Sequence, residues 1–120
     1  MNKKSVIIAV LGLIFIAVII LLFVNFRRPA AAQITLYYGD GCPHCQNVEK
    51  YLTDNKVADQ IKFDRKEVFK DQNNAKEMEE RAVSCGLTTD QGIGVPFLYD
   101  GKNCYVGDTD VINFFNSRIK

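Results

Sequence analysis

Acidic side chains are absent before Asp40, and residues 5–26 carry no charged side chain of either sign. From Gln33 onward the chain holds 11 basic and 14 acidic side chains, a net charge of −3, without a run of Lys or Arg or a stripe of basic and aromatic residues. Nucleic-acid binding depends on a concentrated positive surface, so no nucleic-acid partner is expected. The 120 residues allow one compact domain and a short appendage.

Residues 5–26 form an apolar run of 22 residues. As a helix it would be roughly 33 Å long, enough to cross a bilayer core. A secretory signal has an apolar core of only about 7–15 residues, although Ala30 and Ala32 supply an Ala-x-Ala cleavage site. The 88 residues from Gln33 onward are too few to wrap a helix that is apolar on all sides. We therefore predict a signal-anchor helix in membrane lipid, with a cleaved, secreted form as the alternative.

Orientation follows from the charges that flank this run. Lys3, Lys4 and the terminal amine precede it, and Arg27 and Arg28 follow it. The positive-inside rule then favours a single-pass protein with a cytoplasmic N-terminus and an extracytoplasmic C-terminal domain. The predicted organisation is a short flank at residues 1–4, the anchor at 5–26, a juxtamembrane linker at 27–33 and the domain at 34–120.

Alternating apolar residues predict strands at residues 34–38, 61–64, 95–99 and 104–106, with a hairpin turn at 100–103. Apolar residues at helical spacing predict one helix from Cys42 to about residue 55 and two more further on. Asn73 or Asn74 would cap the second helix, which ends at Gly86, and residue 108 or 109 would cap the last. The order β-α-β-α-β-β-α predicts a mixed α/β sheet whose first two strands are parallel, flanked by helices.

The strongest motif is Cys42-Pro43-His44-Cys45, placed between a strand and a helix. Cys42 at the helix start would meet unpaired N–H groups and the helix dipole, which favour its thiolate. Cys45, one turn later, could close a disulfide with it or resolve a mixed one. Pro43 suits the first helical turn because it lacks an N–H. His44, the only histidine, would stabilise the thiolate when protonated, and we interpret Asp40 as a turn former, with proton acceptor as the alternative.

Segments 37–45 (YYGDGCPHC) and 94–102 (GVPFLYDGK) resemble the glutaredoxin branch of the thioredoxin-like superfamily, and the match extends over about residues 34–120. The resemblance implies a thioredoxin/glutaredoxin-like fold and thiol–disulfide exchange. It also implies that Pro96 is a cis-proline packed against the active-site disulfide and that the backbone of Val95 pairs with the substrate chain. Tyr38 is a further candidate for the substrate groove, whereas Tyr37 and Phe97 are expected to be core aromatics.

The sequence departs from that family at informative positions. Gly39 stands where glutaredoxins usually have a Lys that helps to bind glutathione, and Val106-Gly107 replaces their Gly-Gly. Of these positions only Asp110 is like one that contacts glutathione, so the use of glutathione as a cofactor is doubtful. The Pro-His pair between the cysteines is similar to that of the DsbA-type periplasmic disulfide oxidases, which implies a donor of disulfides.

Cys85 and Cys104 leave two alternatives open. Cys85 continues the apolar stripe of the second helix, and Cys104 shares a strand face with Val106, so both could be buried free thiols. An exported domain with four cysteines could equally tie this helix to the hairpin by a structural disulfide.

These observations predict a membrane-anchored thiol–disulfide oxidoreductase that exchanges disulfides with protein substrates through Cys42 and Cys45. Oxidation is slightly favoured as its direction. The expected partners are protein thiols and disulfides and an electron-transfer protein, and no cofactor or metal is expected beyond the redox-active pair. Two alternatives remain: a module that handles Cu(I) or Zn(II) with the same two cysteines, and a redox-inert thioredoxin-like adaptor.

Overall fold

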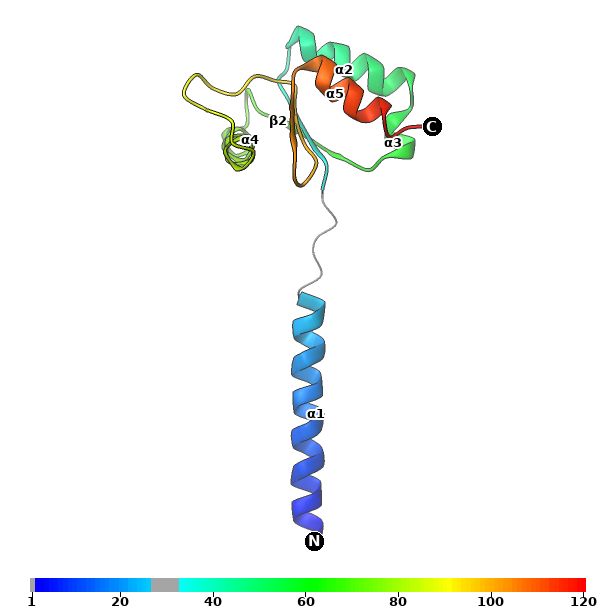
Figure 1. Cartoon of the computed structure of the whole chain (residues 1–120), viewed down its shortest axis with the longest axis vertical. Coiled ribbons are helices and arrows are strands. Elements are labelled where there is room, and N and C mark those ends of the chain that lie inside the picture. The colour runs from blue at the N-terminus through cyan, green and yellow to red at the C-terminus, as the bar shows by residue number, and fades with distance from the viewer. Residues whose placement is uncertain (1, 27–32) are drawn as a thin grey trace. The chain divides into compact units, whose positions relative to one another are not determined.

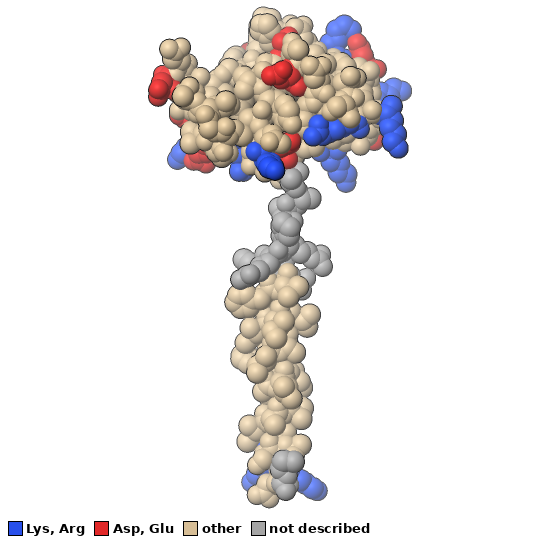
Figure 2. Space-filling model, viewed as in Figure 1, with Lys and Arg blue, Asp and Glu red and all other residues tan. Residues whose placement is uncertain are grey.

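The computed structural model describes residues 2–26 and 33–120, which belong to two compact units divided after residue 31 (Figure 1). The first unit is helix α1 (Lys3–Phe26). It is long and apolar enough to cross a membrane, a test that a signal sequence also passes. Between its ends no charged side chain is visible in Figure 2. Residues 27–32 of the predicted linker, with its two arginines and the Ala-x-Ala site at 30–32, lie outside the described residues.

The second unit is built on a four-stranded mixed sheet of strand order β2-β1-β3-β4. Its strands are β1 (Thr35–Tyr38), β2 (Asp64–Glu67), β3 (Phe97–Tyr99) and β4 (Cys104–Val106). Strand β2 runs parallel to β1, whereas β3 is antiparallel to both β1 and β4. The predicted fold class is therefore confirmed, together with the parallel pairing of the first two strands.

Helices cover both faces of this sheet. Helices α2 (Pro43–Asp54) and α5 (Asp108–Asn116) pack side by side on one face, and α4 (Gln72–Ser84) covers the other (Figure 1). A short helix, α3 (Val57–Gln60), follows α2 and was not expected from the sequence. The predicted order of the other elements holds, and this arrangement leaves the ends of the strands free to carry loops.

The alternation of side chains along β1 divides the core into two parts. Leu36 points to the face under α2 and α5, where it packs with Val48 and Phe115. Tyr37 points to the opposite face under α4, where its ring lies 5.8 Å from that of Phe97. Because successive strand residues face opposite sides, a short strand can serve both layers. The expectation that Tyr37 and Phe97 are core aromatics is confirmed.

Strand β2 begins three residues later than the apolar alternation predicts. Ile61 and Phe63 precede it and pack against the core from the connecting segment. The strand itself has the polar sequence Asp-Arg-Lys-Glu and pairs only with β1, at the edge of the sheet. An edge strand is held by its backbone hydrogen bonds and needs no apolar face, so its sequence gives no alternation to read. Strand β3 likewise begins at Phe97 rather than at residue 95.

The start of α4 also differs from the prediction. Asp71 is its N-cap, and the Asp71 carboxylate accepts hydrogen bonds from the backbone N–H groups of Asn73 and Asn74, the two predicted caps. A carboxylate is an effective cap because it satisfies free N–H groups and interacts favourably with the helix dipole. The helix ends as expected, with Cys85 as its C-cap and Gly86 in the left-handed conformation at φ 76°.

Helix α5 is capped by Gly107 instead of Asp108 or Thr109. The φ of Gly107 is 89°, a value that residues with a Cβ rarely adopt, so glycine suits this entry into the helix. The core contacts of α5 are made by Val111, Phe114 and Phe115, all buried, with Ile112 and Ile119 partly buried beside them.

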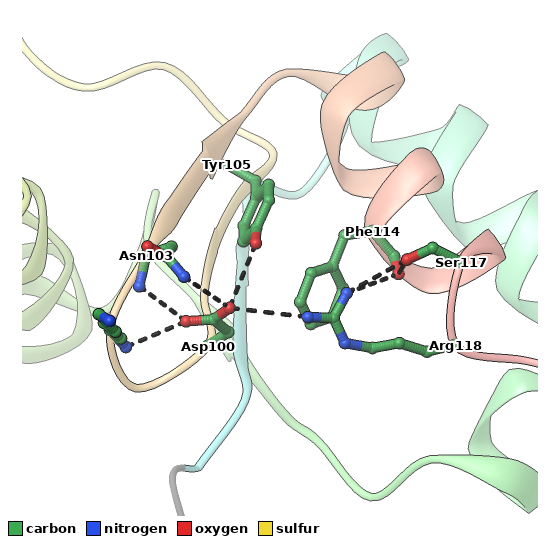
Figure 3. A network of polar contacts seen from close by, with 7 residues as sticks. Asp100, Asn103, Tyr105, Phe114, Ser117 and Arg118 are labelled. Carbon is green, nitrogen blue, oxygen red and sulfur yellow. Dashed lines mark hydrogen bonds and ion pairs between the residues drawn. The ribbon is translucent and has the colours of Figure 1, made fainter.

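A polar network centred on Asp100 closes the β3–β4 turn (Figure 3). The Asp100 carboxylate accepts hydrogen bonds from the Asn103 backbone N–H at 2.7 Å and the Tyr105 hydroxyl at 3.2 Å. Arg118 forms an ion pair with it at 3.8 Å and lies over the Phe114 ring, 3.7 Å from the centroid. Burial of the carboxylate acts to raise the pKa of Asp100, but these hydrogen bonds outweigh it and the pKa is lowered. The network joins the hairpin to the C-terminal segment.

Candidate active site

The two cysteines of the Cys-x-x-Cys motif lie where β1 passes into α2. The chain turns at residues 39–42, with a Cys42 N–H to Gly39 carbonyl hydrogen bond of 3.2 Å and Gly41 at φ 76°. Cys42 is the N-cap of α2, and Pro43 is its first residue. The turn therefore presents Cys42 at the positive end of the helix, as the motif predicts.

Cys42 is half-buried, and its sulfur has two polar neighbours. The Cys45 backbone N–H donates a hydrogen bond to the Cys42 Sγ at 3.2 Å. The Val95 carbonyl oxygen lies 3.6 Å from the same sulfur and can accept the thiol proton. The first contact favours a thiolate, since an N–H donor stabilises negative charge. The second contact gives the thiol proton an acceptor on the segment that carries Val95.

Cys45 has the opposite environment. It is a free thiol, buried with 4% of its surface exposed, against the inner side of the turn. Burial, together with the hydrogen bond and negative charge of Cys42, raises the pKa of the Cys45 thiol to about 12, against the opposing effect of the Gly39 backbone. Cys45 is therefore protonated at neutral pH, and the two sulfurs have distinct reactivities.

The loop that precedes β3 lies against the first cysteine. The Val95–Pro96 peptide bond is cis, as the family resemblance implied. Val95 is half-buried and Pro96 is buried. The Pro96 carbonyl accepts a hydrogen bond from Gly107 N–H at 2.9 Å, which ties this loop to the start of α5. Three segments far apart in sequence thus meet at one end of the sheet.

A family comparison bears directly on this arrangement. The glutaredoxin family model matches residues 34–102, which include both cysteines of the motif and the cis-proline. The chain belongs to the glutaredoxin family. No curated protein matches the sequence closely enough to count as a relative. Thiol–disulfide oxidoreduction is the activity that membership in this family suggests. The match ends before β4 and α5, so the contacts of α5 with this glutaredoxin's motif come from the structure alone.

His44 is an exposed member of the motif in this glutaredoxin. Its side chain is 70% exposed, and its Nδ1 lies 3.1 Å from the Asp108 carboxylate. Asn47 donates a second hydrogen bond to the same Asp108 oxygen at 2.7 Å. The hydrogen bonds from Asn47 and His44 lower the pKa of Asp108, so its charge persists at neutral pH. The Asp108 carboxylate of α5 therefore offsets any positive charge on His44.

The other side of the turn is held by Glu67, the last residue of β2. Its carboxylate accepts hydrogen bonds from the backbone N–H groups of Phe69 at 2.9 Å, Lys70 at 2.8 Å and Asp40 at 3.2 Å. Burial opposes the effect of these donors, yet the pKa of Glu67 is lowered. Asp40 in turn forms an ion pair with Lys70 at 2.6 Å. Asp40 thus lies in the turn, as interpreted, and its carboxylate is paired with the Lys70 ammonium group.

Tyr38, the third residue proposed to contact the substrate, lies half-buried at the end of β1. The guanidinium of Arg65 lies 5.4 Å from its ring centroid, and Arg65 also pairs with Glu49. The ring is thus covered on one side by a side chain of β2. A substrate contact for Tyr38 stays a prediction.

The remaining two cysteines form a disulfide, which decides between the alternatives left open by the sequence. Cys85 at the end of α4 bonds to Cys104 in β4, with a Cα–Cα distance of 6.1 Å. Within the described residues no group of three or more His, Cys, Asp and Glu side chains is arranged to hold a metal ion. The domain thus separates a structural disulfide from the free pair of the motif.

Sequence reasoning did not find Asn47, Glu67, Phe69 or the role of Asp108. Asp108 had been expected only as a helix cap, and it contacts His44 across 64 positions in sequence. Glu67 and Phe69 belong to the polar edge strand and the bend after it, whose pattern carries no motif. The only available signal was Gly39 itself, because a glycine beside an active-site turn often permits a close approach.

Proposed function

We propose that this glutaredoxin is a membrane-anchored thiol–disulfide oxidoreductase that acts on protein substrates through Cys42 and Cys45. The observation that carries the proposal is the asymmetry of the two thiols. Cys42 is accessible and accepts an N–H hydrogen bond at a helix start, whereas Cys45 is buried and protonated. Such a pair supplies one attacking sulfur and one resolving sulfur.

In the reducing direction the chemistry has two steps. The Cys42 thiolate attacks one sulfur of a client disulfide, forming a mixed disulfide and releasing the other client sulfur as a thiolate. Cys45 then loses its proton and attacks Cys42, which forms the Cys42–Cys45 disulfide and releases the second client thiolate. Two electrons pass from the pair to the client, and protons exchange with water. The oxidising direction is the reverse of these steps.

The second step depends on a change at Cys45. Burial is the largest cause of its raised pKa, but the hydrogen bond and charge of Cys42 also contribute. Once Cys42 is in a mixed disulfide, its sulfur is neutral and these two contributions are removed. Deprotonation of Cys45 therefore becomes easier at the stage when its attack is needed.

The cis-proline loop would bind the client. Val95 is half-buried beside Cys42, so its backbone can pair with an extended client segment held at that sulfur. The Pro-His sequence of the motif supports a donor of disulfides, as in DsbA-type oxidases. The pairing of His44 with Asp108 moderates this, because a carboxylate offsets the positive charge that would favour the thiolate.

Helix α1 supports the membrane assignment. It would hold the domain outside the cytoplasm and near the bilayer, where a membrane or soluble electron-transfer partner would reset the pair. A membrane-impermeant thiol reagent applied to intact cells tests this topology. Labelling of Cys42 after mild reduction supports it, and labelling only after lysis contradicts it.

The activity is tested with the full chain in detergent micelles. The reduced protein should speed the reduction of insulin, and the oxidised protein should speed the refolding of a reduced client. Cys42→Ser should abolish both activities while Ser117→Ala, a surface variant remote from the motif, retains them. An adaptor would be indifferent to Cys42→Ser. A measured potential near about −270 mV, that of thioredoxin, would contradict the oxidising direction.

A further inference from the structure

One aromatic residue beside the motif is exposed. Phe69 follows β2 and has 56% of its surface exposed, and it is the only aromatic among the large exposed apolar residues of the described part of the domain. Its own backbone N–H and that of Lys70 are fixed by the Glu67 carboxylate. A ring that is held in place and left in water is a common feature of binding surfaces.

The Phe69 ring lies directly against Gly39. A Cβ added to Gly39 would lie 2.3–2.5 Å from three ring carbons, and Gly39 is buried beneath that ring. The Gly39 carbonyl accepts the hydrogen bond from the Cys42 N–H. The ring therefore occupies the space in which a side chain at position 39 would stand, and it flanks the turn that presents Cys42.

The charges around this turn are mostly negative. Asp40, Glu67 and Asp108 are carboxylates, and the pKa values of Glu67 and Asp108 are lowered. The basic side chains of β2 and the bend after it each have an acidic partner. These ion pairs are Arg65–Glu49, Lys66–Glu77 and Lys70–Asp40. An anionic thiol compound would meet carboxylates and occupied cations here, whereas an apolar side chain would cover the Phe69 ring.

From these observations we infer that Phe69 selects the substrate: the site takes an extended protein segment with an apolar residue next to its cysteine, in preference to anionic low-molecular-weight disulfides such as oxidised glutathione. The inference rests on the proposed function. Val95 would hold the client backbone on one side of Cys42, and Phe69 would contact the neighbouring client side chain on the other.

The test measures how fast the reduced full chain in detergent is oxidised to its Cys42–Cys45 disulfide, by acid quenching and mass spectrometry. Four disulfides serve as oxidants: a peptide dimer with Phe before its cysteine, the same dimer with Ser there, oxidised glutathione and the small neutral bis(2-hydroxyethyl) disulfide. In each reaction two electrons from the thiol pair convert one disulfide into two thiols. We expect the Phe peptide to react about tenfold faster than the Ser peptide and at least tenfold faster than oxidised glutathione.

The variant Phe69→Ser should lose the preference between the peptides and keep its rate with bis(2-hydroxyethyl) disulfide. Val83→Ser is the matched control. Val83 is similarly exposed at 58%, but it lies at the far end of α4, about 17 Å along the helix from its start, and should leave the preference unchanged. The double variant Gly39→Lys/Phe69→Ser has room for a new cation and should react faster with oxidised glutathione than Phe69→Ser does.

Two results would overturn the inference. One is that the wild-type protein reacts with oxidised glutathione as fast as with the Phe peptide, a measurement that needs no variant. The other is an unchanged peptide preference in Phe69→Ser. Failure of the proposed function has a different signature, because the wild-type chain would then fail to react even with the small neutral disulfide.

Discussion

The buried thiol provides the sharpest prediction. In Cys42→Ser the only free cysteine of the folded domain is Cys45, whose pKa in the native pair is about 12 against an ordinary value of 9.0. At about pH 8 a thiol with the ordinary value is roughly one-tenth ionised, whereas one with the raised value is ionised to about one part in ten thousand. The difference in alkylation rate would approach a thousandfold.

The substitution itself removes part of this effect. Burial, the largest cause of the raised pKa, remains, but the hydrogen bond and charge of Cys42 are lost. We therefore expect Cys45 in folded Cys42→Ser to react with iodoacetamide between tenfold and a thousandfold more slowly than in urea-unfolded protein. Its rate should rise about tenfold per pH unit between about pH 8 and pH 10, because the thiolate fraction is still small there.

Alkylation is followed by mass spectrometry at several pH values, with Cys45→Ser as the matched variant. In that variant the remaining thiol, Cys42, is half-buried at the surface and should react readily in the folded state. Equal rates for Cys45 in the folded and unfolded forms of Cys42→Ser would refute the reasoning, since burial would then have no effect on this thiol.

Three further predictions follow from the same contacts. Replacing Cys85 and Cys104 by Ser opens a loop of 19-residue separation and should lower the free energy of unfolding by about 3 kcal/mol, measured by urea denaturation against the intact disulfide form, while insulin reduction persists. The pKa of Asp100 is lowered in the folded state, so the Asp100 carboxylate stabilises the fold at pH values above its ordinary pKa of about 3.9. This contribution is lost as the pH falls through the lower pKa of the folded state. Asp100→Asn should therefore lower the free energy of unfolding by about 1–3 kcal/mol near pH 7 and by much less near pH 3. Asp108→Asn should make the potential of the active-site pair more oxidising, because it removes a carboxylate that offsets positive charge on His44 beside Cys42; a potential that is unchanged or more reducing would contradict this.

Much of the fold follows from local sequence patterns. Strand β1, the hairpin turn and β4 lie where alternation and turn residues predict them, because each has a buried face or a turn of fixed chemistry. The polar strand Asp64–Glu67 could not be located from such a pattern, since only its backbone is needed at the sheet edge. Helix caps were misplaced by a few residues, because Asp71 and Gly107 compete with equally good neighbours.

The candidate site was predictable to the extent that it is local. Cys42, Pro43 and Cys45 lie in one short motif, and the family resemblance pointed to the cis bond before Pro96. The contacts that set the surroundings of this motif are tertiary. The approach of Phe69 to Gly39 spans 30 positions, and no periodicity or spacing encodes such a contact.

Covalent trapping tests the central claim, that Cys42 is the sulfur that exchanges with a client disulfide. The full-length Cys45→Ser variant is mixed with insulin, quenched in acid and mapped by mass spectrometry without reductant. The account predicts an insulin chain attached to Cys42 by a disulfide that a reducing agent removes, and no adduct in Cys42→Ser. An equal adduct in the Cys42→Ser protein, or none in the Cys45→Ser protein, would contradict it.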